Sequence, residues 1–437
     1  MGRPAVSRAA RFPCDDLGAC RSANPRIGNR FVKILFLCIW ADWPSNRPYL
    51  NNEEHEIWYV CNPSGLKYVK NYLAADEIAG LTTPTSEDPR ELMQLLQGVY
   101  QQFPFERVVA VDERSVLPAA YIREVFNIPG PRPAEVDAFR SKRTMKQWLA
   151  PRGVRVIRDL DQAELEAGPF IPCVIKCPDG TASGGVRLCH TQAEYDAHRH
   201  EIAEGSMLEE FVEGEIFHVD GAYNAEGVVA VPHLYINTCF DHYVLGWPVG
   251  SVGVDDPVLK QRLVKFTEEI IAALPLREGV YHLEIIRTPK DELVFLEIGG
   301  RVGGGEVYRN FTDVYNFDLL EFHIASQLGQ SPKLRKVREN TVGGWLMINS
   351  VQHVPGIFTG IRYQPLDDDN CSYSMWHPRL GHKYDLRERM SLKYSFRADT
   401  SAQVRKSVIE LMEKVSLESV PQSEPAPTSA GKLEEVA

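Results

Sequence analysis

The sequence predicts a multidomain protein of the α/β class, and three observations support this. The 437 residues are enough for two or three domains with substantial cores. Between residues 32 and 113, runs rich in β-branched and aromatic residues alternate with an amphipathic helix, which is typical of a parallel α/β domain. Farther along, two apolar runs joined by the polar turn "PKDE" predict an antiparallel hairpin.

The first domain is expected at residues 32–130 and to end at the Pro/Gly break "NIPGPRP". Its strands are expected to be "VKILFLCI", "EIWYVCN" and "RVVAVDE", with the helix "DPRELMQLLQGVYQQF" before the last of them. A small lid subdomain is expected at 131–206, and a larger subdomain with the C-terminal part at 207–416. Residues 1–31 are rich in Arg, Ala and Pro and are interpreted as a disordered extension or as the product of a start codon placed too early; the Pro-rich 417–437 predict a disordered tail.

Composition limits the classes of partner. The net charge of −11 and the pI of about 5.6 argue against a protein that binds nucleic acid through bulk charge. No apolar run has membrane-spanning length, and the nine scattered cysteines contain no CxxC pair, which indicates reduced thiols of a cytoplasmic protein. We therefore expect small-molecule partners without nucleic acid or membrane, and the sequence is compatible with a homodimer.

The hairpin carries the first candidate site. Glu284 lies in "YHLEII" and Glu297 in "VFLEIGG", so the two can face each other across an antiparallel ladder. Two like charges placed in this way repel unless a cation lies between them, and Mg²⁺ takes carboxylates together with phosphate oxygens. The alternative is two acids on a solvated face of the sheet. Arg301 and the glycines just beyond the hairpin favour the site.

Two other stretches are ambiguous by themselves. In "VIKCPDGTASGGV", Lys176 precedes a glycine-rich turn whose backbone N–H groups can approach phosphate oxygens, although an ordinary hairpin turn has the same pattern. In "MLEEFVEGE", an acid pair and an aromatic residue lie between two strand-like segments. This stretch is either a charged linker or a crossing between lobes that offers its backbone to an adenine.

The order of these features resembles the ATP-grasp superfamily, from about Val32 to Lys414: a lysine on a helix, a lysine before a glycine loop, "EEFVEG", a strand acid and then "EIGGRVGG". Within it the chain is most similar to carboxylate–amine ligases, a group that includes D-alanine–D-alanine ligase, biotin carboxylase and bacterial L-amino acid ligases. The resemblance implies an N-terminal parallel α/β domain followed by two α+β subdomains that clasp ATP.

The resemblance also implies roles for individual residues. Lys142 and Lys176 would hold the ATP phosphates, Gly180, Ser183, Gly184 and Gly185 would close over them, and Glu209, Glu210, Phe211 and Val212 would line the adenine, largely through main chain. Glu284 and Glu297 would bind Mg²⁺, for which Mn²⁺ can substitute, and Arg301 would lie near the transferred phosphate. Gly304 and Arg309 are candidates for substrate binding, with a structural ion pair as the alternative for Arg309.

Two departures from the family pattern stand out. The family usually has a metal-binding Asn two residues after the second glutamate, where this chain has Gly299. The ribose-binding acid usually follows the glycine after one intervening residue, but Glu215 follows Gly214 directly. The ribose contact is therefore expected from Glu215, from His218 or from elsewhere.

The expected activity is an ADP-forming ligation. A carboxylate would take the γ-phosphate of ATP to give an acyl phosphate, and an amine, plausibly of an amino acid, would displace the phosphate to give an amide or dipeptide. The alternatives are another ATP-grasp chemistry, such as biotin-carboxylase-like carboxylation or phosphotransfer, and a catalytically silent ATP-binding protein, which Gly299 favours.

Overall fold

The computed structural model describes residues 32–38, 49–50, 55–63, 66, 69, 78–84, 89–161, 164, 171–349, 355–364, 371–384 and 391–422. The expected extension at 1–31 and the end of the expected tail, 423–437, lie outside these ranges. None of the described helices is both long and apolar enough to cross a membrane. Six cysteines are free: Cys61, Cys173, Cys177, Cys189, Cys239 and Cys371.

The N-terminal domain is a four-stranded parallel sheet, as predicted. Its strand order is β3-β2-β1-β4. The elements are β1 (Val32–Cys38), β2 (His55–Cys61), β3 (Gly80–Thr82), α2 (Pro89–Gln102), β4 (Arg107–Ala110) and α3 (Val116–Val125). The apolar stripe of α2 packs on one face of β1 and β4. The three-residue β3 was not predicted, because "GLT" is too short to give a pattern.

An eight-stranded antiparallel sheet forms the centre of the molecule, with the order β12-β11-β8-β9-β10-β13-β17-β15. Its strands are β8 (Glu215–Asn224), β9 (Gly227–Ile236), β10 (Val249–Gly253), β11 (Gly279–Arg287), β12 (Leu293–Gly299), β13 (Val342–Asn349), β15 (Ser372–Trp376) and β17 (Ser391–Ala398). Helix α10 (Pro257–Ala273) and helix α5 (Lys142–Leu149) bury their apolar side chains in a shared core against β8, β11 and β12. The predicted hairpin is β11–β12.

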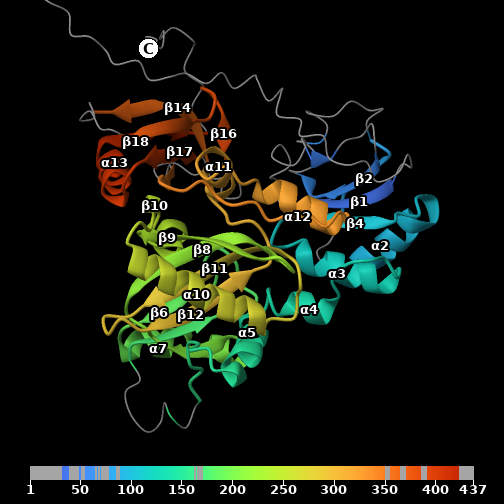
Figure 1. The fold of residues 1–437 in the computed structure, drawn as a ribbon, viewed down its shortest axis with the longest axis horizontal. Helices are drawn as coiled ribbons and strands as arrows, with labels where there is room; N and C mark the ends of the chain where they lie inside the picture. The colour runs from blue at the N-terminus through green and yellow to red at the C-terminus, as the bar shows by residue number, and fades with distance from the viewer. Residues whose placement is uncertain are drawn as a thin grey trace, which may run out of the picture.

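The small lobe is a three-stranded sheet of order β6-β5-β7; Figure 1 labels its strand β6 and its helix α7. Its elements are β5 (Cys173–Lys176), β6 (Arg187–Cys189), α7 (Gln192–His198), α8 (His200–Ala203) and β7 (Met207–Glu210). The expected lid boundaries of 131–206 are wrong at both ends. Met145 and Leu149 of α5 pack in the core of the large sheet, so α5 and the residues just before it belong to the large subdomain. Strand β7 pairs with β5, so the small lobe extends to Glu210.

The C-terminal part closes a third core around helix α13 (Ser401–Lys414). It contains a small sheet of order β16-β14-β18, formed by Lys383–Tyr384, Gly356–Tyr363 and Val415–Pro421. The expectation of a disordered tail from 417 is therefore wrong for its first residues: Leu417 is buried in this core, and β18 pairs with β14. The remaining helices are α4 (Pro133–Asp137), η4 (Ala150–Arg152), α9 (Cys239–Tyr243), α11 (Val307–Asp313) and α12 (Leu319–Gln327).

Helix α12 joins the domains. It packs against β4 of the N-terminal sheet and against β8 and β11 of the central sheet, and Figure 1 shows it between these parts. His323 donates from Nε2 to the carbonyl of Ala110 at 3.1 Å, and Gln327 bonds both the N–H and the carbonyl of the same residue. The end of β4 is thereby held next to the ends of β11 and β12.

Candidate active site

The hairpin glutamates face each other at the edge of the central sheet. Glu284 on β11 and Glu297 on β12 are direct cross-strand partners, which confirms the predicted pairing. Tyr235 donates its hydroxyl to Glu284 Oε1 at 3.1 Å, and His282 Nε2 lies 3.6 Å from the same oxygen. The two carboxylates bring together oxygen donors of the kind that a hard divalent cation prefers.

Lys142 neutralises one of the two carboxylates. It begins α5, is 8% exposed, and its Nζ lies 2.7 Å from Glu297 Oε2 and donates to the Gly180 carbonyl at 3.0 Å. Burial alone would raise the pKa of Glu297, but Lys142, Lys176 and His282 outweigh it and lower the pKa to about 2. Burial also opposes the charge on Lys142, yet Glu297 raises the pKa of this lysine above its ordinary value. Both groups therefore stay charged, and Lys142 links the glycine loop to Glu297 by bonding both.

Two further lysines converge on one carboxylate in the small lobe. Glu209 is 1% exposed, with Oε2 2.7 Å from Lys176 Nζ and Oε1 2.5 Å from Lys146 Nζ. Lys146 also lies 2.6 Å from Asp159, which is half exposed. Because buried charges must be compensated, this excess of cations next to a single buried acid favours an anionic ligand.

The glycine loop connects β5 to β6 and begins directly after Lys176. Ala182, Ser183 and Gly185 have positive φ values of 50°, 57° and 75°, a backbone conformation in which anion-binding concavities form. Gly184 donates its N–H to the Thr181 carbonyl at 2.8 Å, which closes the turn. The loop geometry is suited to phosphate, and that role remains a prediction.

The segment "EEFVEG" crosses between the lobes. Strand β7 ends at Glu210 in the small sheet and β8 begins at Glu215 in the central sheet, so the intervening residues are the connection. Glu210 Oε1 lies 2.9 Å from Arg155, and the Phe211 ring contacts His190 edge-on at 5.4 Å between centroids. Val212 packs against a small apolar cluster. Because the Glu209 side chain pairs with Lys146 and Lys176, an adenine base would meet mainly the backbone of this stretch.

Arg301 is bound by an acid from the N-terminal domain. Its Nε donates to Glu113 Oε2 at 2.6 Å, and Arg140 Nε lies 3.5 Å from Oε1 of the same carboxylate. Burial opposes the charge of Arg301, but Glu113 outweighs it and raises the pKa of the guanidinium. A Cβ placed on Gly299 would lie only 3.3 Å from Glu113 Oε2. Glu113 therefore lies where the side chain of the Asn usual in the family would extend.

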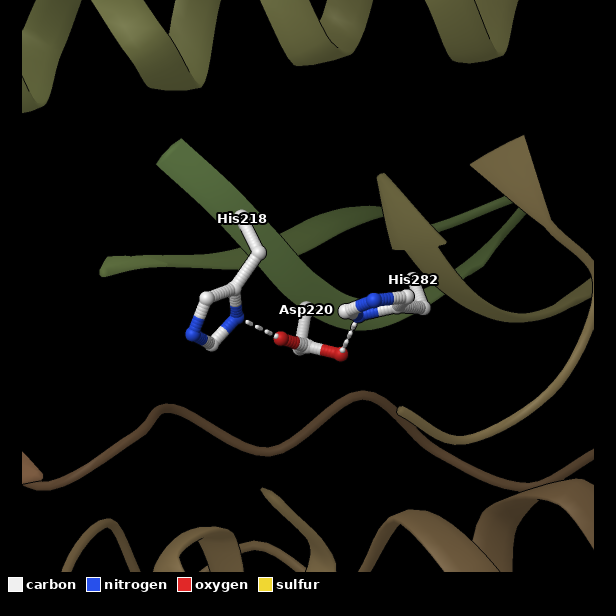
Figure 2. A group of neighbouring side chains, drawn as sticks. All are labelled: His218, Asp220 and His282. Carbon is white, nitrogen blue, oxygen red and sulfur yellow. Dashed lines mark hydrogen bonds and ion pairs between the residues drawn. The ribbon is translucent and has the colours of Figure 1, made fainter. Parts of the chain in front are cut away.

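Figure 2 shows a buried cluster of His218, Asp220 and His282, which adjoins Glu284 through the His282 ring. Asp220 is fully buried, and its oxygens lie 2.5 Å from His218 Nδ1 and 2.8 Å from His282 Nδ1. Burial would raise the pKa of Asp220, but the two imidazoles hold it below its ordinary value, and Asp220 in turn outweighs burial to raise the pKa of His282 to about 10. These atoms are close enough to hold a metal ion. Each Nδ1 already bonds Asp220, however, so we interpret the cluster as a network that directs His282 toward Glu284.

The ribose expectation for His218 is wrong. The ring is 1% exposed, and its second nitrogen, Nε2, lies 2.8 Å from Ser251 Oγ, so both nitrogens are occupied within the sheet. Glu215, the other candidate, lies at the exposed start of β8, where its Oε2 is 2.5 Å from Arg287 NH2. Glu215 remains the predicted ribose contact.

The glycines after Arg301 cross closely over the cluster. A Cβ on Gly303 would overlap Asp220 Oδ1 and lie 2.9 Å from His282 Nδ1, whereas one on Gly304 would have no atom within 4 Å. Arg309 Nε lies 3.4 Å from Glu306 Oε2 and donates to the Tyr308 hydroxyl at 3.1 Å. Arg309 therefore forms an ion pair, which was one of its two predicted roles. Gly304 faces open space and stays a predicted substrate contact.

Four polar residues of the site were not predicted. Lys146 follows Lys142 by four positions and therefore shares its helix face, a signal that was available in the sequence. Asp220 and His282 stand two positions from His218 and Glu284 within apolar strands, which places each pair on one face of the sheet. Glu113 has no local signal, because its position beside Arg301 depends on how two domains meet.

Comparison with known proteins agrees with this geometry. Residues 169–309 match the ATP-grasp domain family. The chain is 25% identical over 292 residues to the L-arginine-specific L-amino acid ligase of Bacillus subtilis, a match covering 61% of this chain and 67% of the relative. It is 26% identical over 250 residues to the 3-methyl-D-ornithine–L-lysine ligase of Methanosarcina mazei, covering 55% of this chain and 57% of the relative.

The fold has a close structural counterpart. The crystal structure of the L-amino acid ligase of Bacillus licheniformis superposes with a TM-score of 0.69 at 16% identity, covering 89% of this chain and 99% of that chain. The predicted ATP-grasp fold, with an N-terminal parallel α/β domain, is thereby confirmed.

Proposed function

Because this chain contains an ATP-grasp domain and is related to amino acid ligases, we propose that it is an ATP-dependent carboxylate–amine ligase that releases ADP and phosphate. One substrate would be an amino acid, and the product an amide or dipeptide. The observation that carries the proposal is the cross-strand pair Glu284–Glu297 with Lys142 on one of its carboxylates. A solvated pair of surface acids would not need a buried lysine against it.

The residues present fit the expected ligands. Glu284 and Glu297 would hold Mg²⁺, with Mn²⁺ as a substitute; when bound, the metal neutralises the charge of the phosphates. Lys142 and Lys176 now pair with Glu297 and Glu209. When ATP binds, their ammonium groups would also bind phosphate oxygens as point charges. Gly184 and Gly185, which are exposed, would lie over the triphosphate.

The remaining groups serve the two chemical steps. In the first, the substrate carboxylate attacks the γ-phosphorus, the bond to the bridging oxygen breaks, and ADP leaves. In the second, the amine attacks the acyl carbon, loses a proton, and phosphate leaves. Arg301 can stabilise the oxyanion formed at that carbon, and Glu113 holds its guanidinium in place. The acyl phosphate must be shielded from water, which closure of the small lobe would achieve.

The test uses the full chain with ATP and Mg²⁺ and pairs of amino acids, beginning with arginine and lysine because relatives are named for them. We expect phosphate release that requires an amino acid, ADP as the nucleotide product, and a hydroxamate when hydroxylamine replaces the amine. AMP as the main product would exclude the acyl-phosphate route. Nucleotide binding without turnover would favour the silent ATP-binding protein, and bicarbonate-dependent turnover would favour carboxylation.

A matched pair of variants connects turnover to the hairpin. Glu297→Gln should abolish phosphate release, since it removes one of the two carboxylates that face each other. Glu292→Gln makes the same change in the exposed turn of the same hairpin and should leave turnover near the wild-type rate. If Glu297→Gln also worked near the wild-type rate, the hairpin would not hold the catalytic metal.

A further inference from the structure

A cavity of about 330 Å³ lies where the N-terminal domain meets the central sheet. Helices α3 and α4 form one side, the start of β11 forms another, and α12 contributes His323 and Ser326. Gly300, the residue before Arg301, is part of the wall, but none of the candidate active-site residues lines the cavity. Its volume is at the small end of the range of ligand pockets.

Three buried polar atoms without partners meet at this cavity. Among the described residues, three buried side-chain polar atoms without a hydrogen bond belong to residues of its wall: Arg123 Nε, Tyr223 Oη and Ser326 Oγ. These residues come from three different elements, α3, β8 and the end of α12. Buried polar groups in native proteins nearly always have partners, so such a concentration in one place indicates a missing polar ligand.

Arg123 brings a buried positive charge to the cavity wall. Arg123 is 3% exposed and donates to the Val108 carbonyl at 2.8 Å and to Gln327 Oε1 at 2.9 Å, but none of the described carboxylates forms an ion pair with it. Burial and the nearby Arg132 lower the pKa of Arg123 to about 10, which still leaves it charged at neutral pH. A buried, unpaired cation is costly, so an anion in the cavity would relieve a penalty already present in the free protein.

Two carboxylates, Glu278 and Glu135, belong to the wall as well. Burial, followed by the charges of these two acids, raises the pKa of Tyr223 above its ordinary value. Both acids are partly exposed. The cavity wall therefore carries the buried Arg123 guanidinium, the carboxylates of Glu135 and Glu278 with the exposed Arg277, and apolar surface from Val116 and Val136.

We propose that this cavity binds a free α-amino acid, at a site separate from catalysis. The amino acid carboxylate would pair with Arg123 and accept from Tyr223 and Ser326, and its ammonium group would face Glu278. A small zwitterion suits this wall, because its carboxylate compensates the buried Arg123 and its ammonium group can pair with a partly exposed acid. The proposal rests on the wall of the cavity alone and would hold even if the chain had no ligase activity.

The test is binding of each of the twenty common L-amino acids to the full chain by calorimetric titration without nucleotide. Tyr223→Phe and Ser326→Ala remove hydroxyls that have no partner, so both variants should fold and melt as the wild type does. Each should raise the Kd of the bound amino acid about tenfold, the value of a hydrogen bond to a charged group.

Tyr281→Phe is the matched control, because the Tyr281 hydroxyl donates to the Val229 carbonyl at 2.8 Å. It should lower the melting temperature and leave the Kd unchanged. Three results would overturn the proposal: no amino acid binds, Tyr223→Phe leaves the Kd unchanged, or Tyr223→Phe destabilises the free protein as much as Tyr281→Phe does. The second result would place the bound amino acid elsewhere, and the third would mean that ordered water already satisfies the hydroxyl.

Discussion

Gly299→Asn gives this chain the residue that ATP-grasp proteins usually have, and the structure predicts that the change is harmful. Gly299 does not have a positive φ, so its backbone accepts a side chain. The obstacle is Glu113, whose Oε2 would lie 3.3 Å from the new Cβ. The Asn amide extends two atoms farther in the crowded space near that carboxylate, so Glu113 must move away from Arg301.

The cost follows from the contact that is lost. Arg301 Nε donates to Glu113 Oε2 at 2.6 Å, and a hydrogen bond between charged groups contributes about 1.5–3 kcal/mol. Gly299→Asn should therefore lower the free energy of unfolding by about that amount. It should also reduce turnover at every Mg²⁺ concentration, because Arg301 is no longer held in place. The double variant Glu113→Ala/Gly299→Asn should lose less unfolding free energy than the sum of the two single changes, because both changes break the same Glu113–Arg301 contact.

The assay is urea unfolding of the full chain, together with phosphate release measured against Mg²⁺ at saturating ATP. Gly304→Asn is the control for stability, because it makes the same substitution in the same loop where a Cβ would meet no atom within 4 Å. A Gly299→Asn protein that unfolds at the wild-type midpoint and works at lower Mg²⁺ would refute the reasoning. Glu113 would then be free to yield its place, and the amide would be a metal ligand.

Three further predictions follow from buried charges. Lys176→Met should weaken ATP binding at least about tenfold, measured by titration, while the fold persists because Lys146 still pairs with Glu209; unchanged affinity would remove Lys176 from the site. Glu209→Gln should cost about 3–5 kcal/mol in urea unfolding, because it leaves two buried lysines without their shared acid; the exposed Glu213→Gln is its control. His323 has a pKa lowered by burial to about 4, so its contribution is present above pH 6.5 and is lost as the pH falls toward 4, by about 2 kcal/mol between pH 7 and pH 5. Urea unfolding of wild type and His323→Leu at the two pH values should show this difference, and identical pH dependence would contradict it.

Much of the fold could be predicted from local patterns. The parallel N-terminal sheet and the β11–β12 hairpin were recognised because their signals, apolar runs and a polar turn, lie within short windows of sequence. The lid boundaries could not be placed in this way. The stripe of α5 shows that the helix is buried, but only the tertiary structure shows that it packs on the central sheet and not on the small one.

The site divides along the same line. Glu284 and Glu297 were predicted to face each other from the hairpin alone, whereas Lys142 was predicted only through the family resemblance; the structure brings the three together. The position of Glu113 beside Arg301 was not predictable, since it depends on the docking of two domains. His218 failed for a different reason: its place in the motif suggested a ligand contact, but in strand β8 it points to the same side as Asp220 and is buried with it.

The glycine run after Glu297 has a structural cause that phosphate binding alone does not explain. Gly303 passes so close to Asp220 and His282 that a side chain there would overlap the carboxylate that holds both imidazoles. Gly299 leaves room for Glu113, and Gly305 has a φ of 66° beside the Trp345 ring, a conformation that favours glycine. Except at Gly304, where a Cβ would meet no atom within 4 Å, neighbouring side chains occupy the space that side chains of this loop would need. Arg301 extends from this crossing, Glu113 fixes where its guanidinium lies, and we propose that its charge reaches the reacting groups.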